Sequence, residues 1–410
     1  NVADPTWGVK LTGKQGRHAM GVFVAEDEIT NLIFPGSQGS DSTSLDLETT
    51  DAVVRYRRDF GESSALGVLL TSREGGGYSN RVAGVDGLWR LGESDSIRFQ
   101  GLESHTEYPL EVALEFDQPA GSFRDRAYQV RYEHDGREWD WYGRYTDVGT
   151  DFRADMGFMP QSDYTFLLGG VTRTWWGDED DWYTEIRLGG DWDLTEDQSG
   201  QMLERVLERE IEVNFNMAGP KQSWFWFGTG VRDRFFDGVT FDNQRFYSTF
   251  FEVQPTGDLW LGNFLGWGEA IDFANTRQGR RLFWEPSVRL NLGLRLRANL
   301  DHDLQRFEVD EGTLFEANLT QLRLVYQLNV RTFVRAIFQY RRIDRTPELF
   351  DDEVDALTER LFTQLLFSYK LNPQTVLFVG YADNREGDEL VDLTQRDRTL
   401  FFKFGYAFVL

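Results

Sequence analysis

The chain has 410 residues and carries 43 Lys and Arg against 68 Asp and Glu, which gives a formal net charge of −25. Such an acidic surface argues against nucleic acid as a partner. The absence of cysteine excludes disulfides, thiolate metal sites and cysteine nucleophiles, and no run of about 18 apolar residues predicts a transmembrane helix.

Alternation of apolar and polar residues at a period of two runs along the chain. Period two predicts β-strands, because successive side chains of a strand point to opposite faces. The clearest segments are 81–91, 288–300, 333–341, 360–371 and 399–410. The segment 201–215 also fits a helix in its first half, but its second half has no helical period and its neighbours are strands, so a strand is favoured. In all, the pattern predicts about twenty-one strands.

The connections between these strands fall into two classes. Tight ones carry the Gly, Pro, Asn and Asp that turns need, and they lie at 14–17, 61–64, 92–95, 134–137, 218–221, 255–258 and 372–374. Long, often acidic ones lie at 29–50, 108–121, 148–162, 345–359 and 387–397. Short and long connections alternate, which predicts an up-and-down meander with one smooth end and one looped end. A short helix is expected within 351–362, where Val354, Leu357 and Leu361 are roughly in phase.

A soluble β-protein and a membrane barrel both alternate, so other features must separate them. The strands are long enough to cross a bilayer, for which about 9–11 tilted residues suffice. The alternating turns and loops are typical of outer-membrane barrels. Aromatic residues gather at expected strand ends, in 223–227, 174–176 and 282–284. These features favour an all-β fold, a large antiparallel up-and-down transmembrane β-barrel with short periplasmic turns and longer extracellular loops, over a soluble propeller or double sandwich.

Three stretches carry a family resemblance: "RRDFGESSALGVLLTSR" at 57–73, "NLTQLRLVYQLNVRTFVRAIFQY" at 318–340 and "RLFTQLLFSYKLNPQTVLFVGYADN" at 360–384. They resemble the C-terminal outer-membrane β-barrel domain of unknown function that follows a family-nine carbohydrate-binding-like module in bacterial proteins. No linker, low-complexity run or change of period marks a domain boundary, so residues 1–410 are expected to form a single barrel domain. The resemblance implies further strands upstream, which would bring the complete barrel to about 20–26 strands, and an N-terminal binding module. A glycan-related substrate is the function that this family context suggests, and no catalytic residue is carried over from it.

The alternation assigns side chains to the two sides of the expected barrel. The side that faces lipid is apolar, and its members at the C-terminus are Phe402, Phe404, Tyr406, Phe408 and Leu410. The side that faces the lumen is charged, and its expected members are Arg289, Arg295, Arg323, Arg335, Arg341, Glu204, Glu208, Glu210, Glu212 and Lys403. Arginine pointing into lipid would cost about 2–4 kcal/mol at the bilayer midplane, so these charges are expected to face water and one another.

The remaining chemistry is sparse. The acidic runs at 178–181 and 351–355 are candidates for calcium, although solvated loops are the commoner outcome. A barrel-embedded hydrolase would need His105 or His134 to converge with an acid and a nucleophile. We therefore expect no enzyme and no other cofactor, but an outer-membrane protein for passage or capture of a solute or polymer. The alternative is a membrane-anchored scaffold whose loops bind a protein or surface polymer. Expected partners are the lipid bilayer, lipopolysaccharide and a periplasmic or surface protein.

Overall fold

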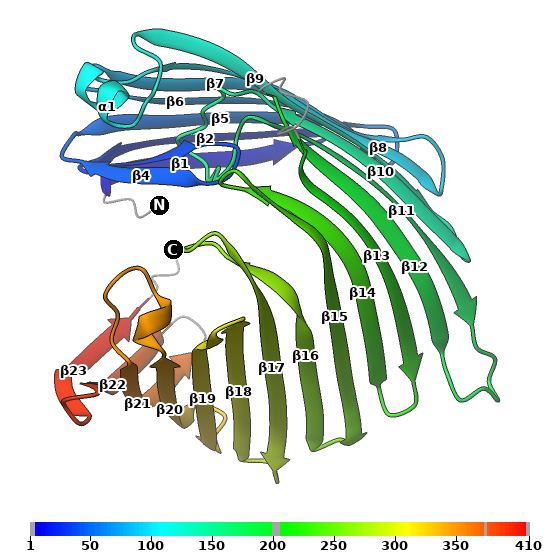
Figure 1. Ribbon diagram of the computed structural model, residues 1–410, viewed down its shortest axis with the longest axis vertical. Coiled ribbons are helices and arrows are strands. Elements are labelled where there is room, and N and C mark those ends of the chain that lie inside the picture. The colour runs from blue at the N-terminus through cyan, green and yellow to red at the C-terminus, as the bar shows by residue number, and fades with distance from the viewer. Residues whose placement is uncertain (1–4, 199–205, 373–374, 407–410) are drawn as a thin grey trace. The chain divides into compact units, whose positions relative to one another are not determined.

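The computed structural model describes residues 5–198, 206–372 and 375–406, and most of them lie in β-strands (Figure 1). The strands up to the middle of the chain are β1 (Pro5–Gln15), β2 (His18–Asp27), β3 (Thr30–Pro35), β4 (Ser40–Leu45), β5 (Thr49–Phe60), β6 (Ser64–Gly75), β7 (Tyr78–Arg90), β8 (Asp95–Glu107), β9 (Ser122–Asp135), β10 (Trp139–Val148), β11 (Tyr164–Trp176) and β12 (Glu185–Asp197). The later strands are β13 (Val206–Gly219), β14 (Ser223–Phe236), β15 (Val239–Thr256), β16 (Leu259–Asp272), β17 (Arg277–Leu292), β18 (Leu296–Val309), β19 (Gly312–Asn329), β20 (Thr332–Arg345), β21 (Leu357–Asn372), β22 (Thr375–Asp388) and β23 (Thr394–Gly405).

In the described part of the chain, 21 strands belong to one sheet, and β3 and β4 form a separate hairpin. The predicted all-β, antiparallel up-and-down architecture is confirmed, and the expected strand number agrees with the main sheet. The segment 206–215 is a strand, β13, as its second half predicted.

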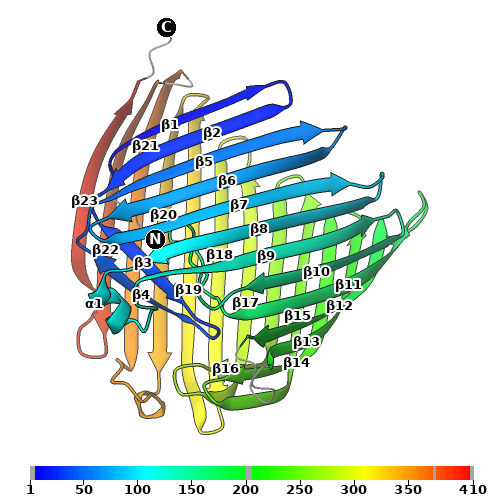
Figure 2. The same ribbon diagram turned by 90° about the horizontal axis from the view of Figure 1, so that it is seen from above.

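The chain divides into two compact units. Unit 1 comprises Asn1–Arg173, Gly189–Ile211 and Arg232–Asp242. Within it, each strand pairs antiparallel with the next in the order β1–β2–β5–β6–β7–β8–β9–β10–β11 (Figure 2).

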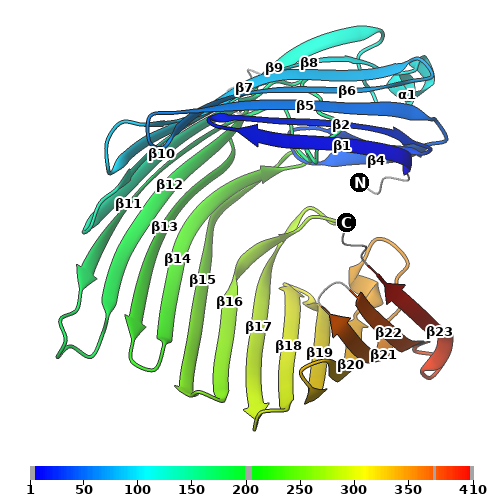
Figure 3. The same cartoon turned by 180° about the vertical axis from the view of Figure 1, so that it is seen from behind.

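Unit 2 comprises Thr174–Leu188, Glu212–Val231 and Asn243–Leu410. Its strands β15 to β23 pair antiparallel in chain order (Figure 3). Direct cross-strand neighbours share one face of a sheet, so the register shows which side chains lie together.

The predicted tight connections lie between consecutive strands, as at β1–β2, where Gly16 has a φ of 58° that favours glycine. The part of the predicted turn at 372–374 that follows Asn372 lies outside the described residues. We call the end of each unit that carries these connections the turn end and the opposite end the loop end. The two ends differ less in the length of their connections than the sequence predicts, because the loop end also contains tight turns. One is the β6–β7 turn at Gly76 and Gly77.

Two local predictions are wrong. The helix expected within 351–362 is absent from these described residues: a short 3₁₀ helix, η1 (Pro347–Leu349), precedes them, and β21 begins at Leu357. Leu357 and Leu361 lie in β21 and share one face of that strand, so they do not form a helix face. The aromatic run 282–284 lies inside β17, whereas 174–176 ends β11 and 223–227 begins β14, as predicted.

Candidate functional site

One face of the unit 2 sheet is apolar and exposed. Phe402 is 70% exposed and lies opposite Val379, which in turn lies opposite Phe367 on the next strand. Phe404 on the same strand face is 60% exposed, and its ring stacks on that of the exposed Tyr406. An apolar surface that continues across neighbouring strands marks a site of contact with another protein or with a membrane. The other predicted lipid-facing residues, Phe408 and Leu410, lie outside the described residues.

The opposite, polar face of unit 2 carries most of the predicted lumen arginines. Arg289 lies opposite Asn299, and Asn299 lies opposite Arg323. Arg335 and Arg341 occupy the same face of β20, which is opposite to the face of the exposed Val334. Lys403 lies opposite Phe378, away from the face of Phe402.

The prediction that Arg295 lies on a strand face is wrong. The segment 288–300 was interpreted as one strand, but a turn at Gly293 to Arg295 divides it between β17 and β18. The alternation continues across this turn, because Leu292 and Leu296, which flank its three residues, lie opposite each other on the same face. Arg295 therefore lies in the connection at the turn end and not on a strand face.

The predicted glutamates alternate along β13 with exposed apolar residues. Glu210 and Glu212 flank Ile211, which is 54% exposed, and Glu208 shares their phase. Within unit 1, the Glu210 carboxylate lies 3.6 Å from Arg232. Glu204 lies outside the described residues.

The long loops of unit 1 fold back onto the polar face of their own strands. The β3–β4 hairpin and α1 (Leu110–Glu115) share a buried apolar cluster with Tyr78, whose members are Leu32, Phe34, Tyr78, Tyr108, Val112 and Ala113. A second buried cluster joins Phe152 of the β10–β11 loop to Val82, Ala127 and Val148. Val82 and Ala127 lie on the polar face of β7 and β9. These long loops therefore pack inward and cover part of this face.

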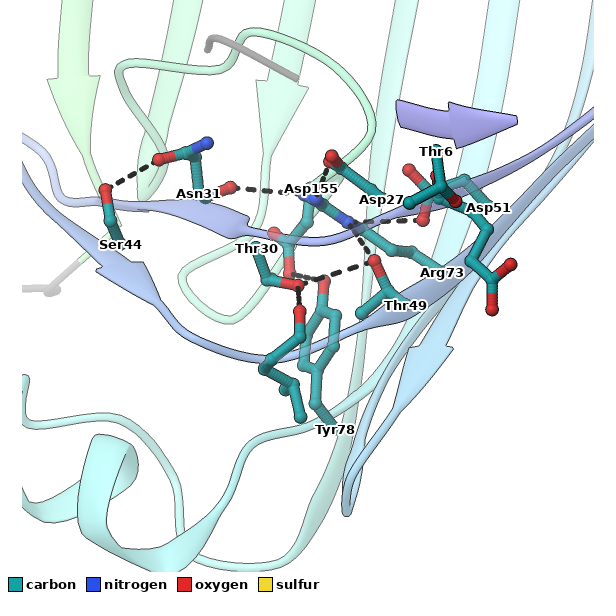
Figure 4. Close-up of polar contacts among 12 residues, drawn as sticks. Thr6, Asp27, Thr30, Asn31, Ser44, Thr49, Asp51, Arg73, Tyr78 and Asp155 are labelled. Atoms are coloured by element: carbon teal, nitrogen blue, oxygen red, sulfur yellow. Dashed lines mark hydrogen bonds and ion pairs between the residues drawn. The ribbon is translucent and has the colours of Figure 1, made fainter. Parts of the chain in front are cut away.

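A buried arginine fixes the hairpin to the sheet. Arg73 on the polar face of β6 is 4% exposed and bridges Asp27 at 2.9 Å and Asp51 at 3.3 Å (Figure 4). Its Nη1 also donates to the backbone carbonyl of Asn31 in β3 at 3.1 Å. A planar guanidinium suits this role because it presents five donors in a fixed fork.

A buried carboxylate fixes the β10–β11 loop, which spans residues 149–163. Asp155 accepts hydrogen bonds from the hydroxyls of Tyr78 at 2.7 Å and Tyr108 at 3.0 Å. Its backbone N–H donates to Asn80 Oδ1 at 3.1 Å. Burial raises the pKa of Asp155, and its tyrosine hydrogen bonds together with Arg153 and Arg73 offset only part of this effect.

The hairpin and the β10–β11 loop also hold each other. Ser162 Oγ donates to the Pro35 carbonyl at 2.9 Å, and Gln161 Nε2 donates to the Ser37 carbonyl at 2.6 Å. Arg153 donates to Gln118 Oε1 at 2.8 and 3.0 Å, which joins this loop to the segment after α1. Three long loops therefore form one assembly, which we call the loop lock.

A polar cavity of about 1020 Å³ opens among these loops and the β14–β15 turn. Its lining includes five aspartates, which are Asp41, Asp117, Asp151, Asp163 and Asp237. Arg153 is the cation among the described lining residues, so the cavity has an acidic wall. This arrangement favours water, polar solutes or cations over anions.

A prediction follows from the burial of Asp155. A raised native pKa means that the neutral acid stabilises the loop lock below the usual carboxyl pKa of about 3.9, and that this contribution is lost as pH rises through the native pKa. Asp155→Asn mimics the neutral acid and should flatten the pH dependence. We expect amide hydrogen exchange across 149–163, corrected for intrinsic rates, to accelerate with pH in the unmodified protein and less so in the variant. Asp163→Asn should retain the slope, and an unchanged slope in Asp155→Asn would contradict the assignment.

The histidines named as hydrolase candidates do not converge. His134 Nδ1 contacts Asp95 Oδ1 at 2.8 Å, and its ring stacks on Trp141 at the turn end. His105 pairs with Arg124 near the loop end of β8, ten positions along the strand from Asp95, or about 30 Å. A triad around either histidine stays a hypothesis.

Nowhere in the described ranges do three or more histidine or acidic side chains gather in a way that would hold a metal ion, so calcium at 178–181 and 351–355 stays a prediction. None of the helices in those ranges has the length and apolar character that crossing a bilayer requires.

Comparisons with known proteins address the fold. No protein-family profile matches the sequence, and no curated protein matches it. The solved structure of the siderophore receptor PirA from Acinetobacter baumannii is similar, with a TM-score of 0.54, 7% identity, and coverage of 93% of this chain and 70% of that chain. The copper transporter OprC is similar with a TM-score of 0.53, 10% identity, and coverage of 95% and 75%. The fold is that of an outer-membrane β-barrel.

Proposed function

We propose that this protein resides in the bacterial outer membrane, where a polar solute or polymer passes along, or is captured on, the polar face of its sheet. The loop lock restricts access to that face. The observation that carries the proposal is the inward packing of three long loops, held by Arg73 and Asp155, on the polar side of an otherwise membrane-type sheet. Loops that only decorated an anchor would not need buried ion pairs on this side.

The two faces support this assignment. The exposed apolar face suits lipid, and the expected surroundings are the bilayer and lipopolysaccharide. The opposite face carries arginines, glutamates and amides that suit a hydrated solute. The two similar structures are described as a siderophore receptor and a copper transporter, which agrees with uptake but does not identify a substrate here. A glycan remains the candidate from family resemblance. We assign no catalytic step.

Conductance tests the proposal. The full chain is reconstituted in planar bilayers beside a variant in which the β3–β4 hairpin, residues 30–45, is replaced by a short Gly-Ser linker. Removing the hairpin should raise single-channel conductance several-fold, because the loop lock loses its Arg73 and Ser162 contacts. A matched replacement of 389–393 in the β22–β23 connection should leave conductance unchanged.

The scaffold alternative predicts a different outcome. A membrane-anchored scaffold whose loops bind a protein or surface polymer would give no ion current in either form. If neither protein conducts ions, although heat-modifiable gel mobility shows that both are folded, the scaffold replaces the passage proposal.

A further inference from the structure

Four arginines line one cavity of about 670 Å³ at the turn end of unit 2. They are Arg295, Arg297, Arg323 and Arg335. The register explains why they meet: Arg297 on β18 and Arg335 on β20 both lie opposite Val325 of β19. Arg323 is two positions before Val325 and so shares its face. Direct and diagonal neighbours on one face lie within reach of long side chains.

These arginines lack carboxylate partners. Among the described residues none of the four forms an ion pair, and Asp258 is the acidic residue in the cavity lining. Arg297 Nε donates to the neutral Asn291 Oδ1 at 3.2 Å, and Arg335 Nη2 donates to the neutral Gln364 Oε1 at 2.8 Å. Arg335 Nε is buried without a hydrogen-bond partner.

Another arginine of the same face shows the contrast. Arg360 of the adjacent strand β21 lies opposite Arg341 and donates from Nε to Glu386 at 2.8 Å. The chain has 68 acidic residues and a net charge of −25, so carboxylates are plentiful. Four unpaired guanidinium groups in one cavity repel one another, and this repulsion is relieved when an anion binds.

We infer that this cavity binds an oxyanionic group, a phosphate, sulfate or carboxylate, carried by the solute. Guanidinium forks hold two oxygens of such a group at once. Phe333 and Val325 in the same lining offer an apolar surface beside the charges, which suits an anion attached to a sugar or other organic body. The biological role of this site rests on the proposed function, because the site defines the charge of the solute that would pass or be captured. Binding of an anion to the site does not depend on passage.

Equilibrium binding tests the inference. The full chain, folded in detergent, is titrated calorimetrically with inorganic pyrophosphate and, separately, with trigalacturonate. Binding of either probe, weakened by raising the salt concentration, is the expected result. Preference for pyrophosphate identifies a phosphate site, and preference for trigalacturonate identifies a carboxylate site.

Variants locate the binding to the cavity. The double change Arg323→Gln and Arg335→Gln should weaken binding by at least about tenfold, because two charged donors to the anion are lost. Lysine instead of glutamine at Arg335 in this double variant should recover part of the affinity, because lysine keeps the positive charge but lacks the forked guanidinium. The control Arg360→Gln removes one ion-paired arginine of the same face and should change affinity less than twofold. Unaltered heat-modifiable mobility shows that each variant is folded.

Two results would overturn the inference: no binding of either probe to the unmodified protein, or equal loss in the Arg360→Gln control and the double variant. Absence of conductance with binding intact would instead contradict passage alone. The two claims therefore fail separately.

Discussion

Replacing Arg73 with methionine is expected to destabilise the loop lock by about 3–5 kcal/mol, the range found when one partner of a buried ion pair is removed. Arg73 and Asp27 have side chains only 5% and 4% exposed, and Asp51 is 15% exposed. The variant leaves two carboxylates facing each other with little water. We expect hydrogen exchange of residues 28–48 to approach that of an unfolded segment, and conductance to rise toward the value of the hairpin replacement.

A neighbouring arginine is the control. Arg81 on β7 bridges Glu74 at 2.6 Å, but the two side chains are 53% and 42% exposed. Arg81→Met should leave the hydrogen exchange of residues 28–48 nearly unchanged, because exposed pairs contribute little. Adding Asp27→Asn to Arg73→Met should recover part of the protection by removing one uncompensated charge. If both methionine variants exchange alike, the buried ion pair does not hold the loops.

The second large effect concerns the apolar face. Phe338 of β20 is 40% exposed and lies opposite Leu322 on one side and Thr363 on the other. Phe338→Arg should lower the free energy of unfolding in lipid by about 2–4 kcal/mol if it lies near the bilayer midplane. Phe338→Leu keeps an apolar contact with lipid and should leave the free energy of unfolding nearly unchanged.

The adjacent residue supplies the matched control. Gln339 lies on the opposite face of the same strand, opposite Gln321 and Phe362. Gln339→Arg places the same charge at the same depth but toward the polar side, so refolding titrations in vesicles should show little change. Equal losses for arginine at 338 and 339 would mean that the apolar face does not contact lipid.

The strands were predictable because their information is local. In β20, Val334 and Phe338 alternate with Arg335 and Gln339, and a period of two fixes both the strand and its faces. The turns were predictable for the same reason, since Gly, Asn and Pro act within three or four residues. Arg295 shows the limit: the turn that begins at Gly293 removes it from both strands, although the alternation continues on either side of the turn.

The loop lock was not predictable, because its contacts join residues far apart that share no period. Nothing near Arg73 indicates that Asp27 and Asp51 would meet it, and nothing near Asp155 indicates Tyr78 or Tyr108. The short alternation of Leu32 and Phe34 in an otherwise polar loop was the available signal for the hairpin. The arginine cavity was predictable in part. The polar phase of Arg323 and Arg335 followed from the sequence, but their convergence depends on cross-strand register, which the sequence pattern leaves open.

The long sequence separations in the loop lock have a consequence for biogenesis. Asp155 meets Tyr78 across 77 positions, and Ser162 meets Pro35 across 127. Such contacts close late, because the intervening chain must be ordered before they offset the entropy of loop closure. The lock can therefore form only after β5 to β10 have paired, and residues 28–48 should stay accessible to proteases in early assembly intermediates. Pairing of β5 to β10 and covering of the polar face by the loop lock are then two separate kinetic events, and the second reports that the first is complete.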